Sequence, residues 1–496
     1  MTGDNTRRDD KPADFMLPES VKNWFTHTYT HLISGNGAEM ARLYDREFHN
    51  LTNNYFKQTT WPEPSAIESL VDSDPTFLLL YKQIYFRHMF SKTQPGMECK
   101  VESWETYCAI FDGILDKSLD IEALPAQWLF DLVGEFVYQY QSYSQYRAKV
   151  ASKSEHEIAL YQANEGIWAT SKVLNYLHAL VRFSKIVEIL KQGSDASNAV
   201  TAPSNTIKEL GFFALVTLSR AHVLYGDYYT ALKLLEPIDF YNKRARNTDS
   251  KVKTNDQIHE KSPACHVSVF YHMGFAQLML QDFAGAIRSF STIILQVQRS
   301  RNYYSRFADY DQLSKLTEKA VALLSIALYL SPGNRVNEQI QSLIREKYGD
   351  KQAKLQKGDT SALTELFSFS APKFILPACP LVDGKAVNRS AEASHVQQKA
   401  FAELVARQAH VPALRSYVKL YRSIDLEKLA LFRGVDADRA RAELIAHKIH
   451  SKSDVHFYVA NNLVLVDEEV NNQRTGEFFI NHIHRFARIV DECSVE

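Results

Sequence analysis

Several short stretches contain residue types that catalytic sites use, and each lacks one member of the required set. "SGNGAEM" (34–40) offers two glycines, but a phosphate-binding loop also needs a lysine followed by serine or threonine. "HEIAL" (156–160) begins like the helix of a zinc peptidase, yet Leu160 stands where the second histidine ligand belongs. The sequence has no Gly-x-Ser-x-Gly nucleophile turn. We therefore predict no catalytic residue, no cofactor and no enzymatic activity.

Histidines and cysteines raise the question of metal binding. His447 and His450 lie three residues apart, and His482 and His484 lie two apart. Zinc needs at least three protein ligands, and no third one accompanies either pair. We interpret these histidines as surface residues and predict no metal site. The five cysteines are scattered without a Cys-x-x-Cys pair, which favours free thiols in a reducing compartment.

Composition and charge limit the classes of protein that fit this chain. With 496 residues and 45% hydrophobic content, it is long enough for several globular domains. The formal net charge of −1 excludes an overall basic field for nucleic acid. Residues 1–14 are polar, lack the apolar core of a signal peptide and are predicted to be disordered. Because the apolar runs are too short for a bilayer, we expect a soluble, cytoplasmic protein without membrane or DNA contacts.

One pattern of apolar and small residues occurs twice, and it predicts how helices are arranged. The two copies share offsets of 0, 9, 12 and 16 and consist of Ser219, Tyr228, Ala231 and Leu235, and of Gly274, Phe283, Ala286 and Phe290. This spacing is typical of tetratricopeptide-like helical hairpins. The small residues let two helices approach closely, and the aromatic residue begins the second helix. Because one hairpin cannot bury its apolar face alone, the pattern predicts stacked repeats.

The copies lie 55 residues apart, which exceeds the usual period of 34. The excess is a polar insertion at 242–263, which we predict to be a solvated loop. Its basic residues Lys243, Arg244 and Arg246 leave an RNA phosphate contact open as an alternative.

Three further stretches predict helices and a linker. Within 127–147 the apolar residues recur at spacings of four and three, which favours one buried face made of Leu129, Val133, Phe136, Tyr140 and Tyr143. Residues 342–370 predict two helices that are broken near Gly358. The three prolines of 371–390 predict an extended linker.

The C-terminal part predicts three short helices followed by a β-hairpin, which is the arrangement of a winged helix. The expected helices cover 411–424, 425–435 and 436–450, the last two with Asp425 and Asp436 as N-caps. Two alternating runs around Asn461-Asn462 predict the hairpin.

The predicted third helix of this module bears on the choice of partner. It carries Arg439, Arg441, Lys448 and Lys452, but its acidic residues interrupt the basic face that a DNA-reading helix presents. Protein contact is therefore favoured. A last helix carries an apolar stripe of Phe479, Ile483, Phe486 and Val490, which we expect to contact other proteins.

Helical hairpins that lead into a winged helix and a terminal helix resemble the PCI-domain family, which the proteasome lid, the signalosome and translation initiation factor 3 share. Long stretches are more specific. "LPAQWLFDLVGEFVYQYQSYSQYR" (124–147), "FYHMGFAQLMLQDFAGAIRSF" (270–290), "REKYGDKQAKLQKGD" (345–359) and "ELFSFSAPKF" (365–374) closely resemble one PCI subunit of eukaryotic translation initiation factor 3. The short link "SKSD" (451–454) departs from that family.

The resemblance implies a mainly α protein, with a tetratricopeptide-like helical-repeat solenoid followed by a PCI winged-helix module that has a small β-hairpin and a C-terminal helix. The expected domains are 1–14 disordered, 15–200 helical, 205–300 helical hairpins with the 242–263 insertion, 285–473 PCI domain with its winged helix at about 411–470, and 474–496 interaction helix.

The resemblance also implies a non-catalytic scaffold subunit that supports the small-ribosomal-subunit pre-initiation complex and mRNA recruitment. The implied partners are other subunits of translation initiation factor 3, especially K and E and the PCI/MPN core, with the small ribosomal subunit reached through the complex. No small-molecule substrate is expected. A scaffold of a degradation complex and a direct RNA-binding winged-helix protein remain as alternatives.

Overall fold

The computed structural model describes most of the chain, and every structural statement below concerns the residues it describes. These are 17–93, 95–149, 154–164, 166–192, 203–241, 255–301, 310–331, 333–356, 361–377, 389–408, 410–450, 456–467, 476, 479–480, 482–484 and 486–487. The segment 1–14, predicted to be disordered, lies outside them.

The chain forms two compact units, each assembled from separate stretches of sequence. The first comprises Met1–Ala276, Gln296–Thr317 and Pro372–His395, and the second comprises Gln277–Leu295, Glu318–Ala371 and Val396–Glu496. Each unit is described by itself below. The domain boundaries expected from the sequence stay a prediction.

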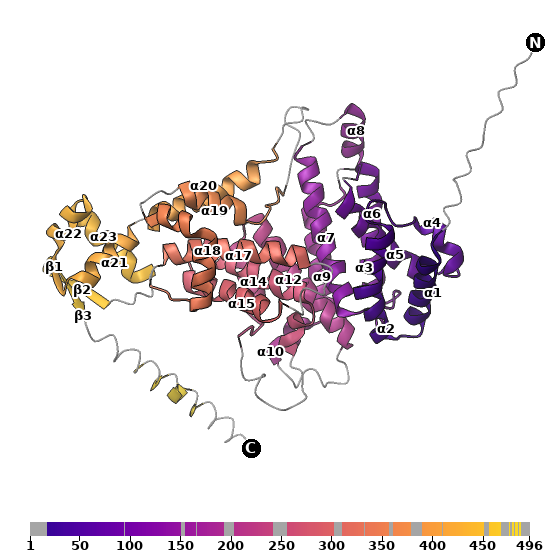
Figure 1. Cartoon of the computed structure of the whole chain (residues 1–496), viewed down its shortest axis with the longest axis horizontal. Helices are drawn as coiled ribbons and strands as arrows, with labels where there is room; N and C mark the ends of the chain where they lie inside the picture. The colour runs from indigo at the N-terminus through magenta and orange to yellow at the C-terminus, as the bar shows by residue number, and fades with distance from the viewer. Residues whose placement is uncertain are drawn as a thin grey trace, which may run out of the picture. The chain divides into compact units, whose positions relative to one another are not determined.

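The first unit is helical in its described residues (Figure 1). Its elements up to residue 260 are α1 (Glu19–Ile33), α2 (Gly37–Arg42), a π-helical turn (Leu43–Glu47), α3 (Phe48–Tyr55), α4 (Pro64–Ile67), a 3₁₀ turn (Glu68–Leu70), α5 (Pro75–Lys92), α6 (Met97–Leu115), α7 (Ala126–Arg147), α8 (Glu155–Ala163), α9 (Thr170–Phe183), α10 (Ile186–Gln192), α12 (Asn205–Tyr225), α13 (Tyr228–Leu235) and a 3₁₀ helix (Asn255–Glu260).

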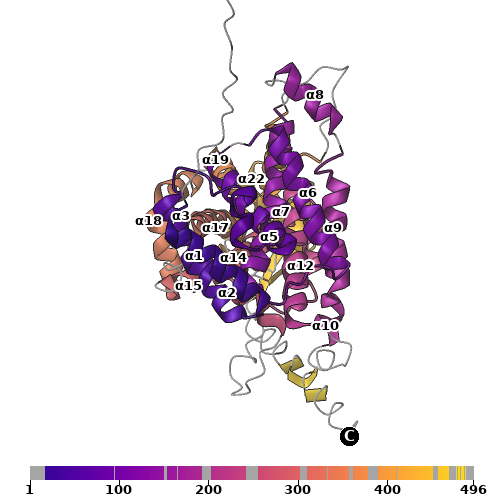
Figure 2. The same cartoon turned by 90° about the vertical axis from the view of Figure 1, so that its right-hand side faces the viewer.

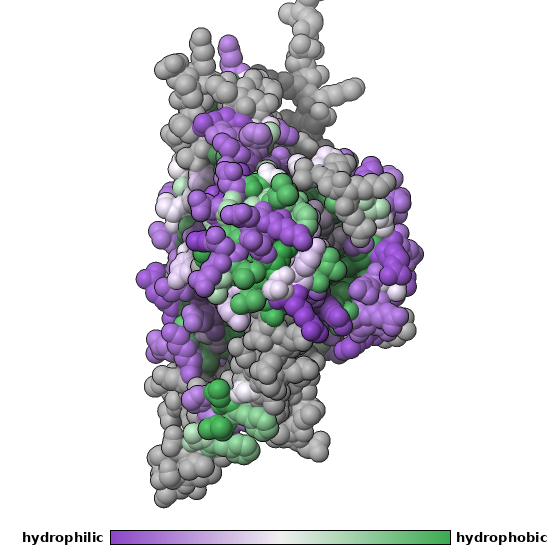
Figure 3. All heavy atoms as spheres, turned by 90° about the vertical axis from the view of Figure 1, so that its left-hand side faces the viewer, coloured by the Kyte–Doolittle hydropathy of each residue, from purple (hydrophilic) through white to green (hydrophobic). Residues whose placement is uncertain are grey.

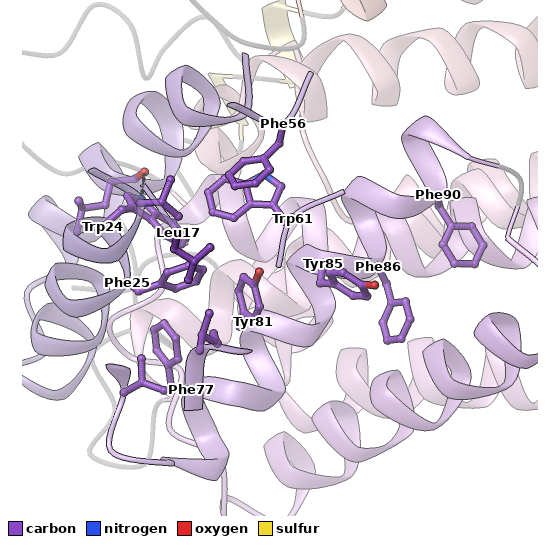
Figure 4. Packing of buried hydrophobic residues seen from close by; sticks show 14 residues of the cluster. Leu17, Trp24, Phe25, Phe56, Trp61, Phe77, Tyr81, Tyr85, Phe86 and Phe90 are labelled. Atoms are coloured by element: carbon purple, nitrogen blue, oxygen red, sulfur yellow. Dashed lines mark hydrogen bonds between the residues drawn. The ribbon is translucent and has the colours of Figure 1, made fainter. Parts of the chain in front are cut away.

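An aromatic cluster forms the core of the N-terminal helices. Figure 4 shows Trp24 and Phe25 of α1 facing Trp61 and Tyr81, with Phe56 beside them. The rings of Phe25 and Tyr81 meet edge to face at 5.0 Å between centroids. Aromatic pairs in this geometry stabilise a core beyond the area that they bury. The cluster therefore holds α1 and α5 together.

Helix α7 belongs to the first unit, and it contacts α5 and α12 (Figure 2). The five apolar residues that the sequence places on one face of 127–147 are all at most 1% exposed. Pro125 stands at the N-cap, where its missing N–H costs nothing. The prediction that this stripe is core is confirmed.

An ion pair with a buried carboxylate crosses from α5 to α7. The guanidinium of Arg87 lies 2.7 Å from the carboxylate of Asp131, which is 8% exposed. The hydroxyl of Tyr44, from the π-helical turn, donates to the same carboxylate at 2.9 Å. Removing only one partner of such a pair destabilises the fold, because the other partner is left as an uncompensated charge away from water.

Residues 372–377 form an extended segment bound to the first unit, and we call it the strap. The backbone N–H of Ile375 donates to the carbonyl of Leu224 at 2.9 Å. Arg147 of α7 donates to the carbonyls of Leu376 and Pro377, the latter at 2.8 Å. Ile375 itself is 2% exposed. The linker predicted at 371–390 is therefore extended in this part, but it is bound rather than free.

Further helices lie between residues 263 and 450, before the terminal helix. They are α14 (Pro263–Met279), α15 (Phe283–Arg299), α17 (Tyr310–Leu330), α18 (Glu338–Gln356), α19 (Ser361–Ser370), α20 (Glu392–Gln408), α21 (Val411–Leu420), α22 (Leu426–Arg433) and α23 (Ala437–His450). Helix α18 has a kink at Tyr348. Among the described helices, none has both the length and the hydropathy to span a bilayer.

The sheet is small and antiparallel, with the strand order β1-β3-β2. Its strands are β1 (Ser423–Asp425), β2 (His456–Ala460) and β3 (Leu463–Asp467). The predicted fold class, a mainly α chain with helical repeats and a small sheet in a winged-helix module, is confirmed.

Candidate interaction surfaces

The first predicted hairpin consists of α12 and α13, which cross closely at two small residues. Ser219 is 2% exposed, and its hydroxyl donates to the carbonyl of Ala231 at 2.8 Å. Gly226 makes the turn with a φ of +86°, a conformation that glycine adopts without steric cost. Tyr228 is the first residue of α13, and its ring meets Phe275 of α14 edge to face at 5.9 Å.

The second predicted hairpin consists of α14 and α15. Gly274 is buried, Ala286 and Phe290 are fully buried, and Phe283, the first residue of α15, is half-buried. In the second unit, the hydroxyl of Ser289 donates to the amide oxygen of Gln277 at 2.7 Å, twelve residues away in the chain. Ser219 and Ala231 are also separated by twelve residues. The contribution of these residues to repeat stacking stays a prediction.

The polar insertion predicted as a solvated loop needs a correction at its C-terminal end. Residues 255–260 form a 3₁₀ helix, and Ile258 and His259 are only 5% and 4% exposed. The ring of His259 stacks on that of His266 of α14 at 5.2 Å. His259 packs on α14 and on Phe212 of α12, and the polar composition alone did not indicate this burial. The basic candidates Lys243, Arg244 and Arg246 lie outside the described residues, so their RNA contact stays a prediction.

The winged-helix module has its own core. Its buried members come from all three helices and from the sheet, and they include Leu414, Val418, Leu426, Leu429, Leu444, Phe457 and Val464. The carboxylate of Asp425 accepts from the N–H of Glu427 at 3.0 Å and caps α22, as predicted. Asn461 and Asn462 have φ values of +48° and +65°, which is typical of the tight turn of a β-hairpin.

The first helix of this module is shorter than predicted. It ends at Leu420, and residues 423–425 pair with β3, with Ile424 opposite Val464. The partner strand lies about forty residues further along the chain, so local sequence carries no signal of this pairing. The prediction of one helix over 411–424 is wrong at its C-terminal end.

The basic residues of α23 are engaged within the module. The ammonium of Lys448 donates to the carbonyl of Phe457 at 2.8 Å, and Arg441 donates to the side chain of Asn462. The guanidinium of Arg439 lies 3.5 Å from the carboxylate of Glu443. The contacts of Lys448 and Arg441 hold the hairpin to α23, whereas that of Arg439 lies within the helix. The choice between protein contact and DNA readout stays a prediction. Lys452 lies outside the described residues.

The histidines predicted to be on the surface divide into two groups. His447 is 4% exposed, and its ring stacks on Phe457 at 6.2 Å, so the prediction for this residue is wrong. It faces the hairpin, whose position the helix periodicity does not reveal. His482 is half-buried, His484 is exposed, and the side chain of His450 lies outside the described residues. In the part of the chain that the structure describes, no three His, Cys, Asp or Glu residues are placed to hold a metal ion.

The described cysteines are free thiols with little tendency to ionise. Burial raises the pKa of the Cys99 thiol to about 11 and raises those of Cys108 and Cys265 as well. Because the thiolate is the reactive form, these residues are poor nucleophiles at neutral pH.

The terminal helix presents large apolar side chains to solvent. Phe479, Ile483 and Phe486 are 59%, 64% and 64% exposed, and Ile480 is 55% exposed. Val490 lies outside the described residues. The sequence stripe omitted Ile480, although its spacing of three from Ile483 places it near the same face. Whether this stripe binds a partner stays a prediction.

Helical hairpins, a winged helix and an exposed terminal helix define a helical scaffold protein of the PCI type. The family model described as RNA polymerase I-associated factor PAF67 matches residues 99–486. Three relatives, each named eukaryotic translation initiation factor 3 subunit L, align with 96% of this chain. The protein from Nematostella vectensis is 35% identical over 93% of its own length, that from Danio rerio 38% over 88%, and that from Homo sapiens 37% over 90%.

The chain belongs to the family of translation initiation factor 3 subunit L. The PCI subunit that the four quoted stretches resemble is this L subunit, and the predicted resemblance is confirmed.

Proposed function

We propose that this chain is a non-catalytic scaffold subunit of translation initiation factor 3. In that role it supports assembly of the small-ribosomal-subunit pre-initiation complex and mRNA recruitment in the cytoplasm. The observation that carries the proposal is the relationship to subunit L proteins along 96% of the chain. A degradation-complex scaffold has no comparable support.

The exposed stripe of the terminal helix supports a scaffolding role. Large apolar side chains that are more than half exposed cost free energy in water, and covering them by a partner recovers about 1.5–3 kcal/mol per residue. Phe479, Ile483 and Phe486 meet this description. We infer that the stripe binds helices of neighbouring subunits, with subunits K and E and the PCI/MPN core as the proposed partners.

The test is a double substitution, Ile483→Asp with Phe486→Asp, in the full chain expressed in cells. Both side chains are 64% exposed, so the substitutions leave the fold intact while charging the docking surface. We expect the variant to lose co-purification of translation initiation factor 3 subunits and to keep its circular dichroism spectrum. Ile33→Asp is the matched control, because Ile33 is 65% exposed on α1. Retained co-purification by the folded double variant would contradict the role of the stripe, and absence of these subunits from the wild-type eluate would contradict the proposed function.

A further inference from the structure

A second exposed apolar surface lies on the winged-helix module. Leu420 of α21 and Leu431 of α22 are 74% and 78% exposed, the highest values among large apolar side chains in the described residues. Phe432 is 43% exposed, and its ring stacks on Tyr417 at 5.6 Å, which joins the two helices. Figure 3 faces this module and shows hydrophobic side chains gathered there among hydrophilic ones. We call this set, with Lys428, the α21–α22 surface.

A lysine is held among these rings. The ammonium of Lys428 lies 5.7 Å from the ring centroid of Tyr421 and 5.7 Å from that of Phe432. Contact with ring faces orients an ammonium without neutralising it. The surface therefore combines apolar anchors with a positioned positive charge.

A hollow of about 360 Å³ adjoins the surface at Leu431. Its lining includes Ala430, Gly434, Val435, Asp436 and Arg439. Gly434 ends α22 with a φ of +66°, and the turn that it makes leaves the space open. The lining of the hollow is more polar than apolar, so the apolar anchors are the exposed side chains beside it rather than the hollow itself. Because Asp436 contributes to the lining, acidic residues of a partner fit better at the Lys428 end.

The charge of this segment points to one class of partner. Residues 411–434 contain five basic and two acidic side chains, whereas the whole chain has a net charge of −1. One of the two carboxylates, Asp425, is used to cap α22, and Arg433 pairs with Glu443 at 3.2 Å. The local excess of positive charge therefore favours a partner with carboxylates.

We propose that the α21–α22 surface binds an acidic amphipathic helix of a partner protein, with apolar side chains against Leu431 and Leu420 and a carboxylate at Lys428. Helix surfaces provide all of its apolar contacts, and they accept the ridge of another helix. Two exposed leucines favour protein over single-stranded RNA, which would use the rings and the positive charge alone. This inference rests on the proposed function, since it names the partner class of one surface of the scaffold.

The experiment replaces Leu431 in the full chain by the photo-crosslinking residue p-benzoylphenylalanine. The complex is irradiated in cells, purified through this chain, and the adduct is sequenced by mass spectrometry. We expect a single protein segment with helical apolar spacing and an excess of Asp and Glu. The same residue at Tyr229 is the control, because Tyr229 is 68% exposed and its ring also lies 6.0 Å from a lysine ammonium, that of Lys233.

Charge variants complete the test. Lys428→Glu should reduce the adduct at position 431 to the level of the Tyr229 control, and Lys428→Arg should keep it. If the position-431 variant fails to fold, Leu420 is the second attachment point, since it is also mostly exposed. An adduct with RNA, with a basic segment or with a second copy of this chain overturns the inference, and so does the lack of any adduct. Co-purification of initiation factor subunits is scored separately. If the complex is intact but no adduct forms at position 431 with Lys428 unchanged, or if the adduct persists in Lys428→Glu, this inference is refuted and the proposed function stands.

Discussion

Replacing Arg147 by alanine should release the strap from the first unit. Arg147 is 8% exposed and donates to the carbonyls of Leu376 and Pro377. A hydrogen bond from a charged donor contributes about 1.5–3 kcal/mol, and two are lost together. Relaxation of the carbonyls toward water recovers part of this, so we expect the strap to bind less tightly by about 3 kcal/mol.

Hydrogen exchange measured by mass spectrometry reads this change directly. The N–H of Ile375 is protected by its bond to Leu224, so its exchange reports opening of the strap. A loss of about 3 kcal/mol makes opening about a hundredfold more frequent, since each 1.4 kcal/mol is a factor of ten. Peptides covering 371–377 should therefore exchange about a hundredfold faster in the variant.

Two further variants separate this explanation from general destabilisation. Gln141→Ala removes one neutral donor to the carbonyl of Lys373, so the effect should be about 1 kcal/mol. Arg182→Ala is the control, because Arg182 is exposed and bonds only within α9, to His178. If exchange in 371–377 is unchanged in Arg147→Ala, the strap is not held by these bonds and the reasoning fails.

Three other outcomes are expected. Ala286→Leu should overpack a fully buried position and lower the free energy of unfolding by about 1–3 kcal/mol, and an unchanged melting curve would count against the hairpin interpretation. Burial raises the pKa of the Asp45 carboxyl in the folded protein to about 6. Above about pH 4 the carboxyl is ionised in the unfolded chain, so folding must bury a charge or bind a proton, and the protein is less stable there than at lower pH. Asp45→Asn should therefore stabilise the protein at pH 7 by about 1 kcal/mol, after allowance for solvent screening, and the gain should vanish as the pH falls toward 4; a gain that persists at pH 4 would exclude this cause. Recombinant protein should hydrolyse no nucleotide, peptide or RNA, and turnover that one substitution in this chain abolishes would overturn the non-catalytic assignment.

Local spacing predicted the helical elements, because the period of a helix relates residues that are only three or four positions apart. The buried face of α7 and the hairpin start at Tyr228 follow from positions three or four residues apart. The cap at Asp425 and the turn at Asn461-Asn462 follow from residue types with strong local preferences.

Contacts between residues that lie far apart in the chain were not predicted from the sequence. Strand β1 exists because Ile424 meets Val464, and His447 is buried because the hairpin covers it. The strap is bound by Arg147, which lies more than two hundred residues before its carbonyl partners in the sequence. A helical period says which face of a helix is apolar, but not which partner covers it, so these features needed the structure.

The sequence by itself determined the class of this protein: helical repeats, a winged helix and membership of a scaffold family, all carried by periodicity, turn residues and long characteristic stretches. Tertiary structure decided which apolar residues are core and which are surface. Leu429 and Leu431 stand two residues apart in α22, yet the first is fully buried and the second is 78% exposed. Hydropathy is the same for both, and only the packing of α21, α23 and the sheet around one side of α22 separates core from docking surface.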